Sequence, residues 1–113
     1  MKLSEIAQRL SLEVKAAAEK LDVEVNGGYA CDLLSYVMAN GKPGDIWITI
    51  QGHPNIVAVA SLINLAGIIV VEGAKIDPVT VAKAEQERIP LLATNETTYS
   101  VAGKLYTLGV HGA

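Results

Sequence analysis

The chain has 113 residues, half of them hydrophobic, which is enough for one compact domain with an aliphatic core and excludes a multidomain enzyme. Nine Lys and Arg against twelve Asp and Glu give a net charge of −3, so no cationic excess favours nucleic acid as a partner. The single cysteine cannot close an intrachain disulfide, and the longest apolar stretch, residues 56–71, is interrupted by polar residues and falls short of a bilayer span. We therefore expect a cytoplasmic protein that neither crosses a membrane nor binds nucleic acid.

The first part of the chain mixes helical and strand-like patterns. Apolar residues three to four positions apart predict a helix over residues 3–10. Residues 12–15 alternate like a strand, whereas the following alanine-rich run to residue 21 has high helix propensity, so local evidence alone slightly favours a helix there. Residues 23–25 alternate again and predict a strand that turns at residues 26–28.

The rest of the chain repeats a strand followed by a helix. After a helix over residues 32–38, strands are predicted at 46–50, 68–71 and 90–93, with helices at 56–65, from 78 onward and at 99–108. Such units in series imply right-handed crossovers. We expect an α/β fold, a single domain over residues 1–113 with a mostly parallel sheet of about five strands, helices on both faces and a frayed tail at 111–113.

A helix–turn–helix is an alternative for the N-terminal segment, because residues 3–21 have roughly the apolar rhythm of that motif. Its second helix would present Glu13 and Glu19 beside Lys15 and Lys20. As many anions as cations would then face the DNA groove, which argues against DNA binding.

Few residues support catalysis. The chain lacks a phosphate-binding GxxxxGK[ST] loop, and His53, His111 and one cysteine do not make a metal-ligand set. Cys31 beside Asp32 is better explained as a small apolar residue of a helix face than as a nucleophile. We expect no catalytic residues, no metal and no cofactor, although an enzyme using His53 as acid or base stays open.

A candidate binding site follows from the predicted topology. Ligands of open α/β sheets bind beyond the carboxyl ends of the strands, where helix N-termini point free N–H groups outward. The polar residues predicted at those ends are Asn26, Gly28, Gln51, Gly52, His53, Asn55, Gly73, Thr94 and Thr97. Gly52 would let a ligand approach the backbone, while His53 and Asn55 would donate or accept at a small anion or a base edge. Residues of these types also cap helices and form turns at strand exits in any α/β domain.

Several segments together resemble a known family. They are Gly52 to Ala60, Ile68 to Gly73, Ile89 to Leu92 and Thr97 to Tyr99, preceded by Leu3 to Ile6, Leu12 to Val14, Leu21 to Val25, Gly28 to Tyr29 and Asp32 to Ser35. This pattern resembles the DRTGG domain over nearly the whole chain, and its early part is similar to the N-terminal domain of HPr kinase. The resemblance makes residues 12–15 a strand, against the local alanine propensity.

The residues that give the family its name are mostly replaced. The Asp-Arg pair falls at His53–Pro54 and the Thr-Gly-Gly triplet at Glu72–Gly73–Ala74, so only Gly73 matches and no role of the Asp-Arg pair carries over. DRTGG domains accompany phosphate acetyltransferases and CBS-domain pyrophosphatases as non-catalytic parts, and also occur alone, sometimes near iron-only hydrogenase components. The resemblance implies a non-enzymatic regulatory or adaptor module, with a metabolic enzyme or a hydrogenase component as candidate protein partner.

Two functional hypotheses follow. Apolar helices together with Trp47, Tyr99 and Tyr106 offer surface for a self-complementary interface, so we expect the regulatory or adaptor module to act as a homodimer. The alternative is a small-molecule sensor that holds an adenine nucleotide or another phosphorylated metabolite over Gly52, His53 and Asn55.

Overall fold

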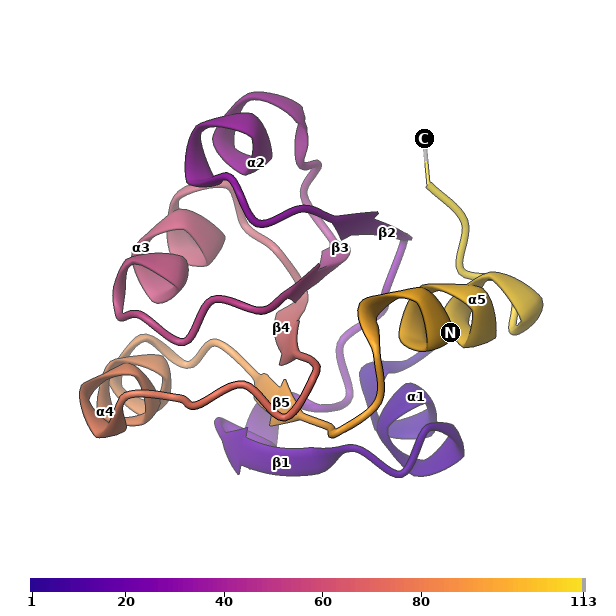
Figure 1. The fold of residues 1–113 in the computed structure, drawn as a ribbon, viewed down its shortest axis with the longest axis horizontal. Coiled ribbons are helices and arrows are strands. Elements are labelled where there is room, and N and C mark those ends of the chain that lie inside the picture. Colours follow the sequence, from indigo (N-terminus) through magenta and orange to yellow (C-terminus); the bar gives the residue numbers. More distant parts are fainter. Residues whose placement is uncertain (113) are drawn as a thin grey trace.

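A computed structural model describes residues 1–112 as a five-stranded sheet with helices on both faces (Figure 1). In chain order the elements are α1 (Leu3–Arg9), β1 (Glu13–Ala16), the 3-10 helix η1 (Ala18–Lys20), β2 (Gly27–Ala30), α2 (Leu34–Asn40), β3 (Asp45–Thr49), α3 (Asn55–Leu62), β4 (Gly67–Val70), α4 (Pro78–Glu87), β5 (Leu91–Ala93) and α5 (Thr98–Thr107). The strand order is β1-β5-β4-β3-β2, and every neighbouring pair is parallel except β1 with β5. The predicted mostly parallel α/β sheet is confirmed.

The sheet separates two hydrophobic core clusters. Ile46 and Ile48 of β3 pack with side chains of α1 and α5. Trp47, between them, points to the opposite face and packs with α2, α3 and α4. The same division is visible in Figure 1, where α2, α3 and α4 lie on one side of the strands and α1 and α5 on the other.

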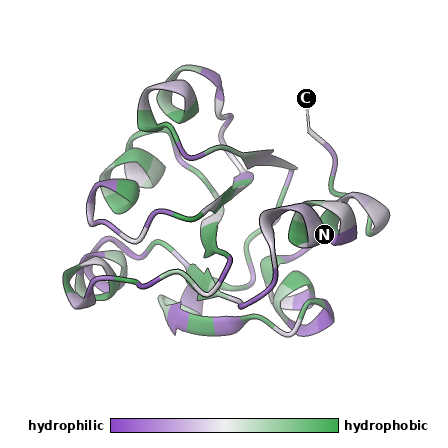
Figure 2. Ribbon diagram, in the orientation of Figure 1, coloured by the Kyte–Doolittle hydropathy of each residue, from purple (hydrophilic) through white to green (hydrophobic). Residues whose placement is uncertain are grey.

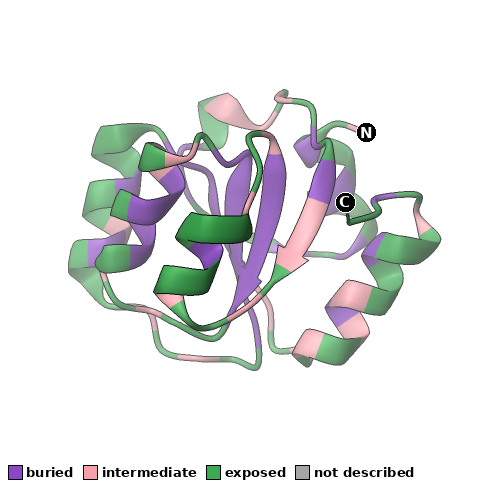
Figure 3. Ribbon diagram, turned by 90° about the horizontal axis from the view of Figure 1, so that it is seen from above, coloured by how far each residue is buried: buried purple, intermediate pink, exposed green. Residues whose placement is uncertain are grey.

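Burial follows the position of each element in these layers. All five residues of β3 are buried, whereas the outer side of α2 is exposed (Figure 3). The three inner strands of the sheet, β3, β4 and β5, are largely hydrophobic (Figure 2), as expected for parallel strands covered on both faces. Trp47 is fully buried and its Nε1 donates to the Cys31 carbonyl (2.8 Å), so the expectation that Trp47 supplies interface surface was wrong.

The predicted strand over residues 23–25 was wrong. This segment instead pairs with the start of the chain: the Leu3 amide donates to the Val23 carbonyl (3.0 Å), and the Val25 amide donates to the Met1 carbonyl (2.9 Å). Val25 is buried in the cluster beneath α1, which accounts for the apolar alternation without a place in the main sheet. The strand β2 begins only at Gly27, where the sequence predicted a turn.

The strand that the family resemblance implies at residues 12–15 is confirmed as β1, whereas the alanine-rich run after it contains only the short 3-10 helix η1. β1 pairs antiparallel with β5, and Ala17 then adopts a left-handed conformation (φ 57°) that ends the strand before the short η1. The helix–turn–helix hypothesis is wrong, because it requires a second helix where β1 lies. Cys31 is half-buried between β2 and α2 rather than on a helix face.

The remaining elements agree with the predictions to within a few residues. At the C-terminus the His111 ring stacks on Tyr106, with ring centroids 4.1 Å apart, so this part of the expected tail is packed against α5; Ala113 lies outside the described residues. Within residues 1–112, no helix has the length and apolar character needed to span a bilayer.

Candidate functional site

The carboxyl ends of β3, β4 and β5 meet at one edge of the sheet, as expected for parallel strands. This edge brings together seven of the nine residues singled out in the sequence: Gln51, Gly52, His53, Asn55, Gly73, Thr94 and Thr97. The other two do not join them. Asn26 precedes β2 and Gly28 lies within it, toward the amino end of that strand, so their expected position after a strand was wrong.

The exit of β3 is organised by Asp32, which sequence reasoning had assigned to the stripe of a helix. Its Oδ1 accepts from the Thr49 hydroxyl and from the Ile50 amide, both at 2.8 Å. Gln51 belongs to the same hydrogen-bond network. Its backbone amide donates to Thr49 Oγ1 (3.1 Å), and its side-chain Nε2 donates to the Asp32 carbonyl (3.4 Å). An acidic residue directly after a strand and before a helix was the available sequence signal.

Gly52 is required for the contact of two chain segments. A Cβ on Gly52 would lie 2.0 Å from the Lys75 carbonyl oxygen, so no side chain fits there. The Gly52 carbonyl accepts from the Asp77 amide (3.1 Å) and from the hydroxyl of the buried Thr80 (2.6 Å). The close backbone approach expected at Gly52 exists, but the approaching group is Lys75 of the same chain.

The N-terminus of α3 is capped by His53, which lies two residues before the helix begins. His53 Nδ1 accepts from the Asn55 amide (3.0 Å), and the His53 carbonyl accepts from the Ile56 amide (3.1 Å). The binding site predicted from the sequence requires these N–H groups to be free to bind an anion. In the structure they are hydrogen-bonded locally, and His53 acts as a cap.

The next two helix N-termini at this edge are capped in the same way. Asp77 Oδ1 accepts from the Val79 amide (2.8 Å) at α4, and Thr97 Oγ1 accepts from the Ser100 amide (3.1 Å) at α5. The Glu72 carboxylate reaches across from the end of β4 to accept from the Thr98 amide (2.9 Å). Because two of these caps are carboxylates, they also place negative charge where a phosphate would otherwise bind.

A hollow of about 630 Å³ lies at this edge, beyond β4 and β5 and beside β1. Apolar and polar side chains both line it: Ser11, Glu13, Lys15, Gly73, Ala74, Ile76, Val81, Ala93, Thr94, Asn95 and Glu96. We call it the β1–β5 hollow. Of the residues singled out in the sequence it contains Gly73 and Thr94, and Asn95 lies beside Thr94 in its lining. The β1 residues Glu13 and Lys15 were missed because β1 reaches this edge only through its antiparallel pairing with β5.

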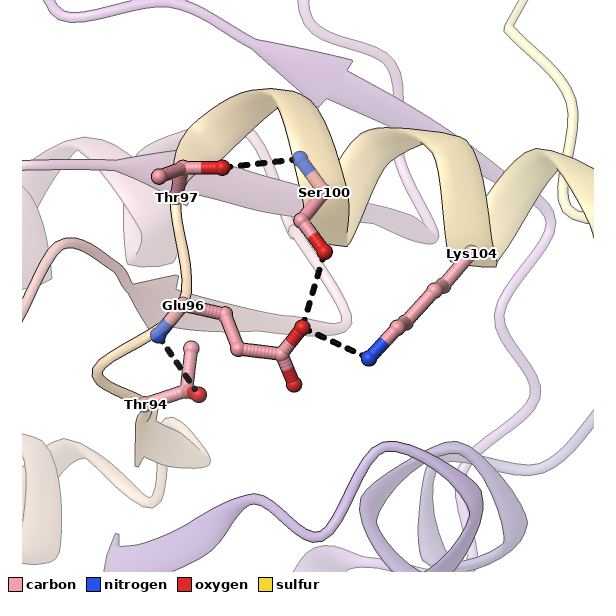
Figure 4. Close-up of polar contacts among 5 residues, drawn as sticks. All are labelled: Thr94, Glu96, Thr97, Ser100 and Lys104. Carbon is pink, nitrogen blue, oxygen red and sulfur yellow. Dashed lines mark hydrogen bonds and ion pairs between the residues drawn. The ribbon is translucent and has the colours of Figure 1, made fainter.

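Charged residues at the rim of this hollow are paired. Lys15 Nζ lies 2.6 Å from Glu13 Oε1 on β1. Glu96 accepts from Lys104 Nζ (2.6 Å) and from the Ser100 hydroxyl (2.8 Å), as Figure 4 shows. Hydrogen bonds from Lys104 and then Ser100 lower the pKa of the Glu96 carboxyl.

A second hollow of about 390 Å³ lies beside His53 and is lined by Gly52, His53, Lys75, Asp77 and Pro78. The segment between β4 and α4 separates the two. Its alternate residues Ala74 and Ile76 line the β1–β5 hollow, whereas Lys75 and Asp77 line the smaller one. Residues 74–77, whose backbone packs on Gly52, therefore divide the predicted site into two separate hollows.

Fold and site together define a small α/β domain whose polar edge residues mainly cap its own helices. The chain belongs to the DRTGG domain family, since the model of that family matches residues 5–108. It is similar to the crystal structure of the CBS and DRTGG domains of the regulatory region of Clostridium perfringens pyrophosphatase, complexed with its activator diadenosine tetraphosphate. The TM-score is 0.75 at 18% identity, over 90% of this chain and 44% of that one, so this chain spans less than half of the regulatory region. A search of curated proteins gives no match.

Proposed function

We propose that this chain is a non-catalytic regulatory or adaptor module that acts as a homodimer. The observation that carries the proposal is the use of the polar edge residues. His53, Asp77 and Thr97 each accept a hydrogen bond from the helix that follows, and the Gly52 carbonyl accepts from Thr80. A nucleophile or general base needs a reacting group within hydrogen-bond reach, and these side chains are directed to backbone amides instead.

The family supports the same role. In the pyrophosphatase the DRTGG domain belongs to a regulatory region, beside CBS domains. By analogy, the partner of this chain is a metabolic enzyme or a hydrogenase component in the cytoplasm.

The proposal is tested by incubating the purified chain at high concentration with ATP, pyrophosphate and acetyl phosphate and following each by 31P NMR. We expect no turnover above the rate in buffer. Turnover that His53→Ala abolishes, and that Asn40→Ala at the end of α2 leaves unchanged, would replace the module with an enzyme built on His53. His53 is the informative position because it is the only histidine at the carboxyl edge.

A second candidate function, a small-molecule sensor, is favoured by the β1–β5 hollow. Its volume falls within the range of roughly 300–1,000 Å³ typical of ligand sites. Ile76, Val81 and Ala93 offer an apolar wall for a planar base, and Thr94 and Asn95 offer hydrogen-bonding groups at its edge. The pyrophosphatase regulatory region was crystallised with an adenine dinucleotide, which makes adenine nucleotides the first class to test.

The sensor is separated from the adaptor by thermal unfolding with AMP, ATP and diadenosine tetraphosphate. A ligand that binds only the folded chain stabilises it by about 2.7 kcal/mol at a hundredfold excess over Kd. The sensor hypothesis expects a concentration-dependent rise in Tm that Asn95→Ala reduces and Asn40→Ala does not. An unchanged Tm with all three nucleotides favours the adaptor.

A further inference from the structure

The β1–β5 hollow forms where the edge strand extends beyond the helix that covers it. Glu13 lies opposite Ala93 in the pairing of β1 with β5, so their side chains are on the same face of the sheet. α4 is fastened over the other end of β1, where the Ala17 amide donates to Glu85 Oε2 (3.1 Å). Near Glu13, which is exposed, the helix contributes Val81 to the lining. The face is left open there over half-buried apolar side chains: Ala74, Ile76, Val81 and Ala93.

Asn95 presents an uncommitted amide to this hollow. The residue is exposed, and within residues 1–112 no hydrogen bond engages its side chain. Its Oδ1 lies against Gly73, where a Cβ would be 2.9 Å away and where φ is 63°, so a side chain at Gly73 would displace the amide. A primary amide offers a donor beside an acceptor, which matches an amino group beside a ring nitrogen on the edge of a nucleobase.

Two further polar groups of the lining are available to a ligand. Glu96 accepts from Ser100 and from Lys104 through the same oxygen, Oε1, so within the described chain its other oxygen has no hydrogen bond (Figure 4). The exposed hydroxyl of Ser11, just before β1, also has no partner in the part of the chain that the structure describes. A carboxylate oxygen and a hydroxyl suit the hydroxyl groups of a sugar.

The charges of the lining favour a ligand without phosphate. Its ionisable side chains are two carboxylates, Glu13 and Glu96, and one cation, Lys15, which lies 2.6 Å from Glu13. Lys104 is paired with Glu96 in the same way. The N-terminus of α4 at this edge is capped by a carboxylate of its own. A phosphate bound here would therefore meet two negative charges and, in the described lining, no unpaired cation.

We propose that the β1–β5 hollow binds an unphosphorylated nucleoside of the adenosine type, whose base carries an amino group beside a ring-nitrogen acceptor. The base packs on the apolar side chains of the floor. The Asn95 amide bonds the amino edge, with Oδ1 accepting from the amino group and Nδ2 donating to the ring nitrogen. The sugar hydroxyls bond to Glu96 and Ser11. The proposal rests on the sensor function proposed above and names its ligand class.

The first test compares adenosine, AMP, ATP and guanosine by isothermal titration calorimetry. AMP and ATP should each bind about tenfold or more weakly than adenosine, because their phosphates face the two carboxylates. Added NaCl should narrow this difference, because it screens the repulsion. Guanosine should also bind weakly, since it presents two acceptors, O6 and N7, where adenosine presents a donor and an acceptor. A nucleotide that binds more tightly than adenosine overturns the ligand class and leaves the sensor standing, whereas no binding of any compound overturns both.

The second test locates the site with variants that thermal unfolding shows to be folded. Asn95→Ala should weaken adenosine binding about tenfold, whereas Asn40→Ala, which removes an amide at the end of α2, should leave it unchanged. Glu13→Gln releases Lys15 and removes one negative charge, so the preference for adenosine over AMP should fall severalfold. Glu5→Gln, which removes a carboxylate paired with Arg9 on α1, should not alter that preference. Adenosine binding that survives Asn95→Ala, or a preference that Glu13→Gln leaves intact, overturns the assignment to this hollow.

Discussion

Two neighbouring regions of the carboxyl edge are built from similar residues and behave differently. Around Gly52 the backbone of Lys75 fills the space, and Thr80 and Asp77 hydrogen-bond to the Gly52 carbonyl. Around Asn95 the chain leaves a hollow of about 630 Å³. Both regions contain glycine, threonine and asparagine, so the residue types alone do not distinguish a strand exit that is packed against another chain segment from one that borders a hollow.

The difference arises from what each region packs against. Gly52 faces the segment that joins β4 to α4, which must pass over the exit of β3 to reach its helix. The β1–β5 hollow faces an antiparallel edge strand whose exposed side chains pair with one another. The first region is expected to govern stability, and the second to tolerate substitution.

The largest effect is expected for Gly52→Ala. A Cβ placed 2.0 Å from the Lys75 carbonyl oxygen forces two backbone segments apart, which costs about 3 kcal/mol or more. Gly103→Ala is the matched control, because a Cβ there meets nothing within 4 Å on the exposed side of α5, and it should stabilise the helix by about 0.5–1 kcal/mol. Urea unfolding measures both. Equal stability of the two variants would show that the Gly52 contact relaxes freely.

Thr80→Val is expected to be the next most costly change. It keeps the shape of a buried side chain but removes the 2.6 Å hydrogen bond to the Gly52 carbonyl, at about 1–2 kcal/mol in the free energy of unfolding. Thr107→Val, on the exposed side of α5, should change stability by less than about 0.5 kcal/mol. If Thr80→Val lowered the free energy of unfolding no more than Thr107→Val does, the packing around Gly52 would not depend on this hydrogen bond.

Asp77→Ala removes the cap of α4 and should cost about 1 kcal/mol. Asn95→Ala, in the β1–β5 hollow, should leave the unfolding free energy nearly unchanged, since Asn95 is exposed. Thermal unfolding of the two variants side by side compares the two regions directly. A larger loss for Asn95→Ala than for Asp77→Ala would reverse the comparison.

The smallest effect is expected at the rim of the hollow. Lys104 and Ser100 lower the pKa of Glu96 in the folded chain. The ionised Glu96 therefore stabilises the folded state at pH values above the ordinary pKa near 4.5, and this contribution is lost as the pH falls through the lowered pKa. Lys104→Met should raise the Glu96 titration midpoint in carboxyl-detected NMR. The variant should also have a lower free energy of unfolding than the unmodified chain at neutral pH, and this difference should shrink as the solution is acidified below the ordinary pKa of Glu96. A midpoint unaffected by the substitution would mean that the ion pair in Figure 4 does not persist in solution.

The candidate site could be predicted only in outline. The exits of β3, β4 and β5 were predictable because buried apolar runs followed by glycine, asparagine and threonine are local signals. That His53 caps α3, and that Gly52 meets Lys75, depended on the path of the chain between β4 and α4. Asn26 was misplaced because residues 23–25 pair with the start of the chain and pack in the core beneath α1, and do not form a strand of the sheet.

The sequence by itself determined the order of strands and helices from residue 32 onward, because periodicities of two and of 3.6 residues, together with caps such as Asp77 and Thr97, are written in neighbouring residues. Only the tertiary structure decided that residues 13–16 form an edge strand and that β2 begins at Gly27. Backbone hydrogen-bond partners in a sheet come from distant parts of the chain, and a segment of ambiguous propensity takes the conformation that satisfies them.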